Sequence, residues 1–342
     1  MRILLINVDS RWNMAIRRMM AYYSGEGHNV EMRDIGLSGY PHNRNVTIDA
    51  SEFDRVYVSN IFERNAYRVT IEGCSQVEYG GIGSRNPDKQ LPAEIEATAP
   101  FYYPDEKVSY GFITRGCIRN CWFCKVPKYE GKLTVYNAVE QIVRGVPGEK
   151  VKFLDNNILA YPGHCDVFRW LIKHNTRCEF NQGLDFRLVT NENLELLAKL
   201  NYMGEYIFAF DDPKYEKILE KKVQQIKRYI SRPWKLKFYI YHHPDMDLMS
   251  TIARVEWCRR HKCLPYIMRD QACWESEQRD FLIDYSAYCN QAALFKKLTF
   301  EQFLEKRYPS PKSQARKTRS LMIYNDAKEA YEQMADQSGE DK

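Results

Sequence analysis

Three cysteines in the run GCIRNCWFC carry the strongest chemical signal in the sequence. Cys117, Cys121 and Cys124 follow the spacing C-x3-C-x2-C. Three thiolates this close together, on a loop that leaves a strand, can bind three irons of a cubane cluster and leave the fourth iron without a protein ligand. A substrate or cofactor can chelate that open iron. The spacing therefore predicts a 4Fe–4S cluster with one accessible iron.

Two other interpretations of these cysteines stay open. A structural zinc site usually takes four ligands in two pairs, and although His164 and Cys165 could complete one, neither stands at a zinc-finger spacing. Alternatively, the three thiols are buried and unrelated. Four later cysteines match no compact ligand pattern, and we expect them in the core, where free cysteines are common. They are Cys258, Cys263, Cys273 and Cys289.

Polar residues also gather in the third of six apolar segments that follow residue 108. In the run FNQGLDFR, strand alternation places Asn181 and Gly183 on the same face as Asp185 and Arg187, with Gln182 on the other. Such a polar strand is costly unless it lines a polar cavity. Arg187 could hold a ligand carboxylate and Asp185 a donor of the substrate. The alternative is an Asp–Arg pair that only fixes the strand.

Other apolar segments end in polar residues as well. FAFDDP places Asp211 and Asp212 at a strand end as ribose-binding or substrate-binding candidates, although one of them could cap the following helix. YIYHHP brings Tyr241 to the same edge with two adjacent histidines, of which we expect at most one to be functional. LDNN ends another strand with Asp155, Asn156 and Asn157, where a plain turn is the alternative.

Six strand-then-helix units must position these side chains. We expect strands at 108–114, 151–155, 177–189, 205–210, 235–241 and 264–270. Apolar residues at helical spacing lie between them, including a stripe over 135–143, and Thr134, Asn191 and Asp247 stand where helix N-caps belong. Six such units should curl into a partial parallel (β/α)6 barrel with its active site at the carboxyl ends of the strands.

The residues before and after these units differ from them. Residues 1–103 begin with the continuously apolar strand RILLINV, a helix and further strands, which is typical of a Rossmann-like open α/β sheet. The barrel is expected over 104–290. Residues 291–342 should form a helical extension with a basic tail, because Lys306 to Arg319 include no acidic residue. That tail is either a solvated, partly mobile terminus or an arm that contacts phosphates.

With the cysteine spacing placed after the first barrel strand, residues 105–290 resemble the radical S-adenosylmethionine (SAM) superfamily. The resemblance implies a cluster on Cys117, Cys121 and Cys124, with the amino and carboxylate groups of SAM on the open iron. Reductive cleavage of SAM would give a 5′-deoxyadenosyl radical that abstracts hydrogen. The implied SAM contacts are Phe123, Asp155, Asn156, Asn157, Asn181, Arg187, Asp211 and the backbone around Ile267 and Met268. The candidate catalytic residues are Asp185, Asp212 and Tyr241.

The first domain resembles the cobalamin-binding domain that precedes the barrel in one branch of this superfamily, with GGIG at 80–83 in support. The loop after its first strand, VDSRWNMAIRR, has no histidine to ligate cobalt. We therefore expect the domain to have lost cobalamin and kept its shape. The alternative is that cobalamin binds without a protein ligand.

The resulting hypothesis is a radical SAM enzyme that rearranges or functionalises a C–H position, with a flavodoxin- or ferredoxin-like protein as one-electron reductant. The runs FLDNNILA and NQGLDFRL resemble small radical SAM proteins of bacteria and their phages. The basic tail and the net charge of +5 suit a modified nucleobase in DNA as substrate. The alternatives are a cobalamin-dependent methyltransferase and a metal-stabilised nucleic-acid-binding module. Without a signal peptide or a long apolar run, we expect a cytoplasmic protein with no membrane partner.

Overall fold

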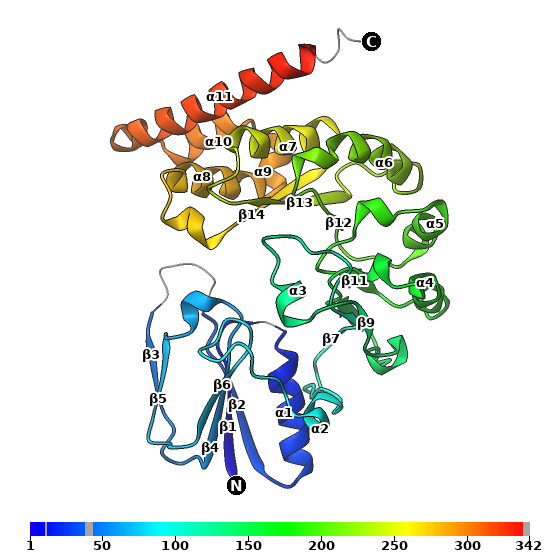
Figure 1. The fold of residues 1–342 in the computed structure, drawn as a ribbon, viewed down its shortest axis with the longest axis vertical. Helices are drawn as coiled ribbons and strands as arrows, with labels where there is room; N and C mark the ends of the chain where they lie inside the picture. The colour runs from blue at the N-terminus through cyan, green and yellow to red at the C-terminus, as the bar shows by residue number, and fades with distance from the viewer. Residues whose placement is uncertain (11, 38–43, 338–342) are drawn as a thin grey trace. The chain divides into compact units, whose positions relative to one another are not determined.

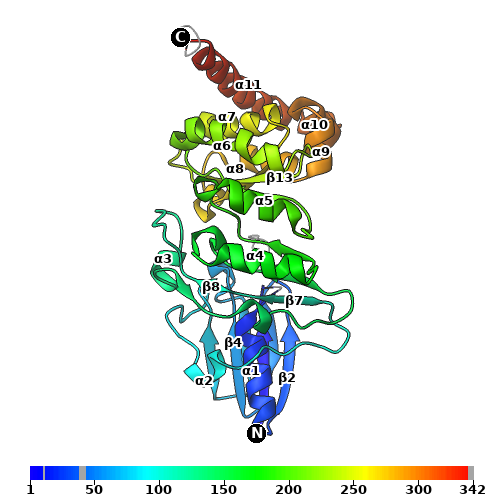
Figure 2. The same ribbon diagram turned by 90° about the vertical axis from the view of Figure 1, so that its right-hand side faces the viewer.

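The computed structural model describes residues 1–10, 12–37 and 44–337. The chain divides into two compact units, Met1–Lys150 and Val151–Lys342 (Figures 1 and 2). The domain boundaries expected at 103/104 and 290/291 remain predictions. Both units contain parallel strands and helices, so the expectation of an α/β fold is confirmed at that level.

The N-terminal unit is built on a four-stranded parallel sheet with the order β2-β1-β4-β6. These strands are β1 (Arg2–Asn7), β2 (Asn29–Asp34), β4 (Arg55–Ser59) and β6 (Val77–Gly80). Helix α1 (Met14–Gly25) covers one face of the sheet, and the pair β3 (Val46–Asp49) and β5 (Val69–Glu72) lies on the other (Figure 1).

Strand β1 is buried on both faces, as its continuous apolar run predicts. Ile3 and Leu5 pack with Ile16 of α1, whereas Leu4 and Ile6 pack with the core on the side of β3 and β5. Helix α1 begins after Asn13, whose side chain accepts a hydrogen bond from the backbone N–H of Ile16. The rest of this unit consists of short elements: η1 (Glu63–Asn65), α2 (Ala93–Glu96), β7 (Val108–Gly111), β8 (Thr114–Arg115), α3 (Val126–Tyr129), β9 (Thr134–Val135) and η2 (Val139–Gln141).

The C-terminal unit alternates parallel strands with helices. Strand β10 (Lys150–Phe153) pairs with β11 (Cys178–Phe180), and β12 (Tyr206–Ala209), β13 (Leu236–His242) and β14 (Leu264–Arg269) form a second parallel sheet. A single parallel bridge between Leu184 and Phe208 joins the chain after β11 to β12. The intervening helices are α4 (His164–Lys173), α5 (Asn191–Lys199), α6 (Glu216–Tyr229), α7 (Leu248–Arg260) and α8 (Arg279–Cys289), with η3 (Ile158–Ala160), η4 (Phe186–Leu188), η5 (Pro213–Tyr215) and η6 (Gln271–Trp274) between them.

Two of the sequence-based element predictions are wrong. The stripe over 135–143 does not form a helix, because Thr134 and Val135 pair antiparallel with Arg115 and Thr114 and leave only the short η2 beyond them. Thr134 is therefore a strand residue and not an N-cap. The third strand ends at Phe180 and not near 189, since Gly183 adopts a φ of +104° that strand geometry excludes.

The other predicted caps are close to the observed ones. Asp247 caps α7 by accepting from the backbone N–H groups of Met249 and Ser250, as predicted. Helix α5 is capped one residue earlier than expected, by Thr190, with Asn191 as its first helical residue.

Three helices and a short turn make up most of residues 292–337, and the predicted boundary of a separate helical extension stays a prediction. The helices are α9 (Ala292–Lys297), α10 (Phe300–Arg307) and α11 (Gln314–Gln337), with the turn η7 (Pro311–Ser313) before α11 (Figure 1). Within the described residues, no helix combines the length and the apolar character needed to cross a membrane.

Candidate functional site

The three motif cysteines lie on a loop of the N-terminal unit that is framed by a two-stranded hairpin. Strands β8 and β9 pair antiparallel on either side of the loop. Gly116 opens it with a φ of +76°, and a Cβ atom there would lie 2.2 Å from the carbonyl oxygen of Lys132. The backbone N–H of Cys117 then donates to the carbonyl of Gly131 at 3.2 Å. The chain therefore needs glycine at 116 to start the loop.

All ten cysteines of the chain are described, and each is a thiol outside any disulfide. Cys117, Cys121 and Cys124 are half-buried, as a ligand thiol that must be reached by metal would be. The backbone N–H of Arg119 donates to Cys117 Sγ at 3.4 Å, and Cys124 N–H donates to the carbonyl of Cys121 at 3.0 Å. Among the described residues, no three His, Cys, Asp or Glu side chains are arranged as a ready-made site for a single metal ion.

The loop also exposes large apolar side chains. Trp122 is 69% exposed and Ile118 is 51% exposed. Phe123, the residue that the resemblance places near adenine, packs edge-on against Trp122 with ring centroids 5.7 Å apart. The exposed ring of Trp122 thus lies beside the motif cysteines, with the half-buried ring of Phe123 against it.

In the C-terminal unit, the residues after β10 are placed in the core as well as at the strand end. Asp155 and Asn157 are buried. Asn157 Oδ1 has no hydrogen-bond donor among the described residues. A buried acceptor without a donor costs free energy, so this oxygen is suited to a donor that a ligand supplies.

The pair Asp185 and Arg187 does not lie along a strand face, contrary to the alternation predicted for 181–187. Asp185 instead caps η4, accepting from the backbone N–H of Arg187 at 3.1 Å. The Arg187 guanidinium donates to both carboxylate oxygens of Asp185, from Nε at 2.7 Å and from the terminal nitrogen at 2.9 Å. It also lies 4.6 Å from the ring centroid of Tyr215. Asn181, by contrast, accepts at its carbonyl from the hydroxyl of Tyr239.

Asp211 and Asp212 separate into two roles. Asp212 is the cap of η5, accepting from the backbone N–H of Lys214 and pairing with its ammonium group at 2.5 Å. Asp211 is directed into the protein, where it accepts from the backbone N–H of Tyr241 at 2.9 Å. Burial raises the pKa of Asp211 to about 6, against the lowering effects of that hydrogen bond and of Arg254 and Arg187.

Tyr241, on β13, lies beside Asp211 and belongs to the same group of polar side chains. Its hydroxyl donates to Asp270 Oδ2 at 2.7 Å, and burial, followed by this carboxylate, raises the pKa of Tyr241. The adjacent histidines diverge, as expected. His242 is buried between Thr251 and Gln278, where burial lowers its pKa, whereas His243 faces Asp245 and Asp270.

At β14, the backbone hydrogen-bonding groups of Ile267 already have a partner within the protein. The backbone N–H of Ile267 donates to Asn290 Oδ1 at 2.7 Å, and its carbonyl accepts from Asn290 Nδ2 at 3.0 Å. The role predicted for the backbone at Ile267 and Met268 stays a prediction, and at Ile267 a ligand would compete with Asn290. Arg269 lies 4.5 Å over the ring of Trp274.

Two residues of this cluster were not singled out from the sequence. Arg254 is buried on α7 and donates to the carbonyls of Phe210 and Tyr241 and to Thr251 Oγ1. Burial lowers its pKa to about 10. Its place between the apolar residues Ile252 and Val255 is a signal in the sequence, because buried arginines are rare unless paired. The sequence does not single out Asp270, because a polar residue directly after a strand is common in turns.

Comparison of the chain with protein-family models and with curated proteins gives no match. The chemistry of the site is therefore argued from its own residues. The cysteine loop offers three thiols, and the C-terminal unit offers a cluster of Asp211, Arg187, Arg254, Tyr241 and Asp270.

Proposed function

We propose that the protein is a radical SAM enzyme that abstracts hydrogen from its substrate in order to rearrange or functionalise it. The observation that carries the proposal is the set of three half-buried thiols within eight residues on one glycine-started loop. A donor set of three thiolates suits an iron–sulfur cluster and is one ligand short of a closed zinc site. Cys117, Cys121 and Cys124 would hold the cluster.

When bound, a 4Fe–4S cluster supplies the electron that cleaves the sulfonium of SAM, and an external flavodoxin- or ferredoxin-like protein replaces that electron. The chain's own residues would bind and orient SAM. Asn157 Oδ1 is a buried acceptor ready for the methionine ammonium group, and Asp155 beside it is a second buried acceptor. Asn156, Asn181 and the aromatic ring of Phe123 complete the proposed contacts.

Asp211, Arg187 and Arg254 set the charge at the strand ends of the C-terminal unit. Arg187 is committed to Asp185 by two hydrogen bonds, so we propose that a SAM carboxylate would reach it only beside that pair. We propose that ribose hydroxyls would donate to the Asp211 carboxylate beside the hydrogen bond that it accepts from the Tyr241 N–H. As part of this proposal, the parallel strands form the partial (β/α)6 barrel of the superfamily.

The proposed catalytic residues differ in how they are held. Asp185 forms an ion pair with Arg187. We propose that Asp185 acts by holding the Arg187 guanidinium in position. Tyr241 is oriented by Asp270, which holds its phenolic proton at a defined oxygen. Asp212 keeps a partly exposed carboxylate and is the candidate for substrate contact. A modified nucleobase in DNA is the proposed substrate class, and cytoplasmic location is part of the same proposal.

The first experiment is anaerobic reconstitution of the full chain with iron and sulfide, followed by SAM and dithionite. We expect about four irons per chain and release of 5′-deoxyadenosine. Cys121→Ala should lose both, whereas Cys165→Ala, which removes a half-buried thiol outside the motif, should keep them. Tight zinc and no SAM cleavage would overturn the proposal in favour of a metal-stabilised binding module.

Cobalamin does not fit the N-terminal unit as a histidine-ligated cofactor. The loop after β1 has no imidazole. Its acidic residue, Asp9, is engaged by the backbone N–H groups of Ile61 and Phe62 and by Asn65. No step of the proposed reaction therefore passes through cobalamin, and a cobalamin-dependent methyltransferase is not our proposal.

A further inference from the structure

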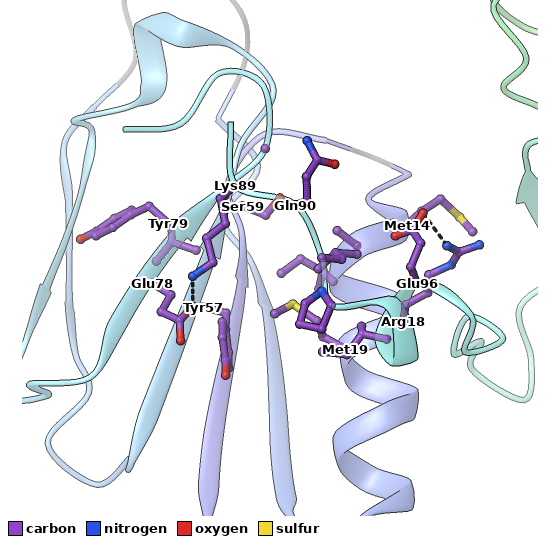
Figure 3. A pocket seen from close by; sticks show the side chains of 18 of the residues that line it. Met14, Arg18, Met19, Tyr57, Ser59, Glu78, Tyr79, Lys89, Gln90 and Glu96 are labelled. Atoms are coloured by element: carbon purple, nitrogen blue, oxygen red, sulfur yellow. Dashed lines mark hydrogen bonds and ion pairs between the residues drawn. The ribbon is translucent and has the colours of Figure 1, made fainter. Parts of the chain in front are cut away.

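A cavity of about 400 Å³ lies in the N-terminal unit beside the carboxyl ends of β4 and β6 (Figure 3). Its walls come from α1, from these two strands and from the segment 89–96, which includes α2, with Phe112, Arg115 and Tyr136 completing the lining. In open parallel sheets, ligands bind outside the carboxyl ends of the strands. The volume is at the lower end of the range for small-molecule sites, enough for one ring system and its substituent.

One part of the cavity wall is apolar and aromatic. Met19, Val58 and Ile95 contribute aliphatic surface, and Tyr57 contributes a ring that is stacked on Tyr23 with centroids 5.5 Å apart. The hydroxyls of the two tyrosines bond to each other at 2.8 Å, so neither ring is free to turn away. A flat, apolar body would bury its surface against this wall.

The rest of the lining is charged, with an excess of cations. Four cationic side chains face two carboxylates, and the residues are Arg18, Arg55, Lys89, Arg115, Glu78 and Glu96. Lys89 pairs with Glu78, and Arg18 pairs with Glu96 at 3.0 Å (Figure 3). Arg115 pairs with Glu130 at 2.9 Å just outside the lining, so Arg55 is the one cation of the described lining without a carboxylate partner. This single excess positive charge favours an anionic ligand.

Arg18 carries a second indication of a ligand. It is 5% exposed, and its Nε atom has no acceptor among the described residues. A buried guanidinium donor without an acceptor is costly, and an acceptor atom that a ligand brings beside Arg18 would remove that cost. Phosphate and carboxylate groups match the fork of a guanidinium best.

We propose that this cavity binds a small aromatic anion of nucleotide size, with its ring on the wall of Met19 and Tyr57 and its anionic group at Arg18. The site uses residues of the N-terminal unit alone and needs no cluster, SAM or corrinoid. A test of this proposal is therefore independent of the radical SAM proposal.

The test is calorimetric titration of the full-length protein, without reconstitution, with adenosine and thymidine 5′-monophosphates and with the corresponding nucleosides. We expect one monophosphate to bind at one site with a Kd below about 1 mM, and its nucleoside to bind at least tenfold more weakly. Failure of both monophosphates to bind at that concentration would overturn the proposal.

Matched variants locate the binding. Ala15→Phe places a ring into the cavity from α1, and Ala21→Phe makes the same change on α1 away from the cavity lining. The first should weaken binding at least tenfold and the second should not change it. Equal affinities in the two variants would place the nucleotide elsewhere, for example at the proposed SAM site, and overturn the assignment.

Arg18→Gln tests the anionic contact. The monophosphate should lose at least tenfold in affinity while the nucleoside is little affected, because only the phosphate needs the guanidinium. An equal loss for both ligands would make Arg18 structural. Displacement of the bound monophosphate by hydroxocobalamin would instead assign the cavity to a corrinoid and overturn the proposal.

Discussion

Asp211 is a carboxyl group whose ionisation is shaped by its burial in the C-terminal unit. Its pKa rises from 3.8 to about 6, chiefly through burial. Because the folded pKa exceeds the unfolded value, the folded protein binds this proton more tightly, and stability falls as the pH rises between these values. A shift of this size corresponds to about 3 kcal/mol.

We therefore predict that Asp211→Asn changes how stability depends on pH. The variant keeps an oxygen that can accept from the Tyr241 N–H but cannot ionise. Relative to the variant, the native protein should lose about 2 kcal/mol of unfolding free energy between pH 4 and pH 6.5. Urea unfolding at a series of pH values measures this, and parallel curves would show that Asp211 keeps an ordinary pKa.

Arg187 is predicted to matter for stability as well as for SAM binding. Its two hydrogen bonds neutralise a carboxylate that is almost fully buried. Arg187→Ala should cost about 1–3 kcal/mol of unfolding free energy, because Asp185 is left without a cation. Replacing both residues, as Asp185→Asn with Arg187→Ala, should recover part of that loss.

Measurement of SAM binding by Arg187→Ala separates the structural role of Arg187 from its proposed role in binding SAM. Where folding is retained, the cluster absorbance should remain and SAM should bind at least tenfold more weakly. A folded Arg187→Ala with unchanged SAM affinity would leave the pair with Asp185 as a purely structural one.

At the scale of elements, the cysteine loop depends on Gly116. Its φ of +76° and the 2.2 Å approach of a Cβ to the Lys132 carbonyl together exclude a side chain. Gly131, on the returning side of the loop, has a similar φ of +72° but open space around its Cβ position. The two glycines thus share backbone strain and differ in steric contact.

We predict that Gly116→Ala lowers the iron bound after reconstitution by at least half, since the loop must shift away from Lys132. Gly131→Ala bears only the conformational cost of a positive φ, about 1–2 kcal/mol, and should keep most of its iron. Iron content and melting temperature of both variants provide the measurement. Equal iron loss in the two would mean that backbone strain alone, and not the close approach, shapes the loop.

The elements that the sequence predicted well are those with one clear periodicity. The strand RILLINV and the helix after it were predicted correctly, because burial on both faces of a strand, or on one face of a helix, leaves a periodic pattern in the residues. The helix predicted over 135–143 was wrong because its first residues, which are β-branched, pair with β8. Local sequence patterns do not predict such a tertiary contact. The polar segment 181–187 failed because Gly183 and the cap by Asp185 replaced strand alternation.

The same distinction applies to the candidate site. Residue type and position after a strand were enough to select Asp211 and Tyr241, which lie together in the structure. Their partners Arg254 and Asp270 come from other elements, and only the tertiary fold brings them there. The sequence predicts which groups carry charge, whereas the fold decides which charge each group meets.

At the scale of the C-terminal unit, the basic segment 306–319 belongs to the packed structure more than to a free arm. Arg307 and Arg316 both pair with Asp284, and Lys317 pairs with Glu305. The two interpretations of this segment, a solvated and partly mobile terminus or an arm that contacts phosphates, stay predictions. A phosphate-contacting role for them would require these ion pairs to break.

Asp284 on α8 contacts both of the C-terminal helices α10 and α11 through its carboxylate. Its side chain is 0% exposed and accepts from Tyr308, Arg316 and Ser320 in addition to the ion pair with Arg307. These four partners lie on α10, on α11 and in the turn between them. A buried carboxylate with two arginines is stable only as a complete set, since removal of one charge leaves the others uncompensated.

We predict that Asp284→Ala costs about 3–5 kcal/mol of unfolding free energy and releases α10 and α11 to proteolysis. Asp280→Ala, which removes an exposed acid that meets the same Arg316 at 3.5 Å, should cost less than about 1 kcal/mol. Urea unfolding and limited trypsin digestion of the two variants give the comparison, because Arg307, Lys312 and Arg316 become cleavage sites once the helices detach. If Asp284→Ala were as stable and as resistant as Asp280→Ala, apolar packing of Phe300, Phe303 and Leu304 would suffice to hold the extension, and the buried carboxylate would add nothing to it.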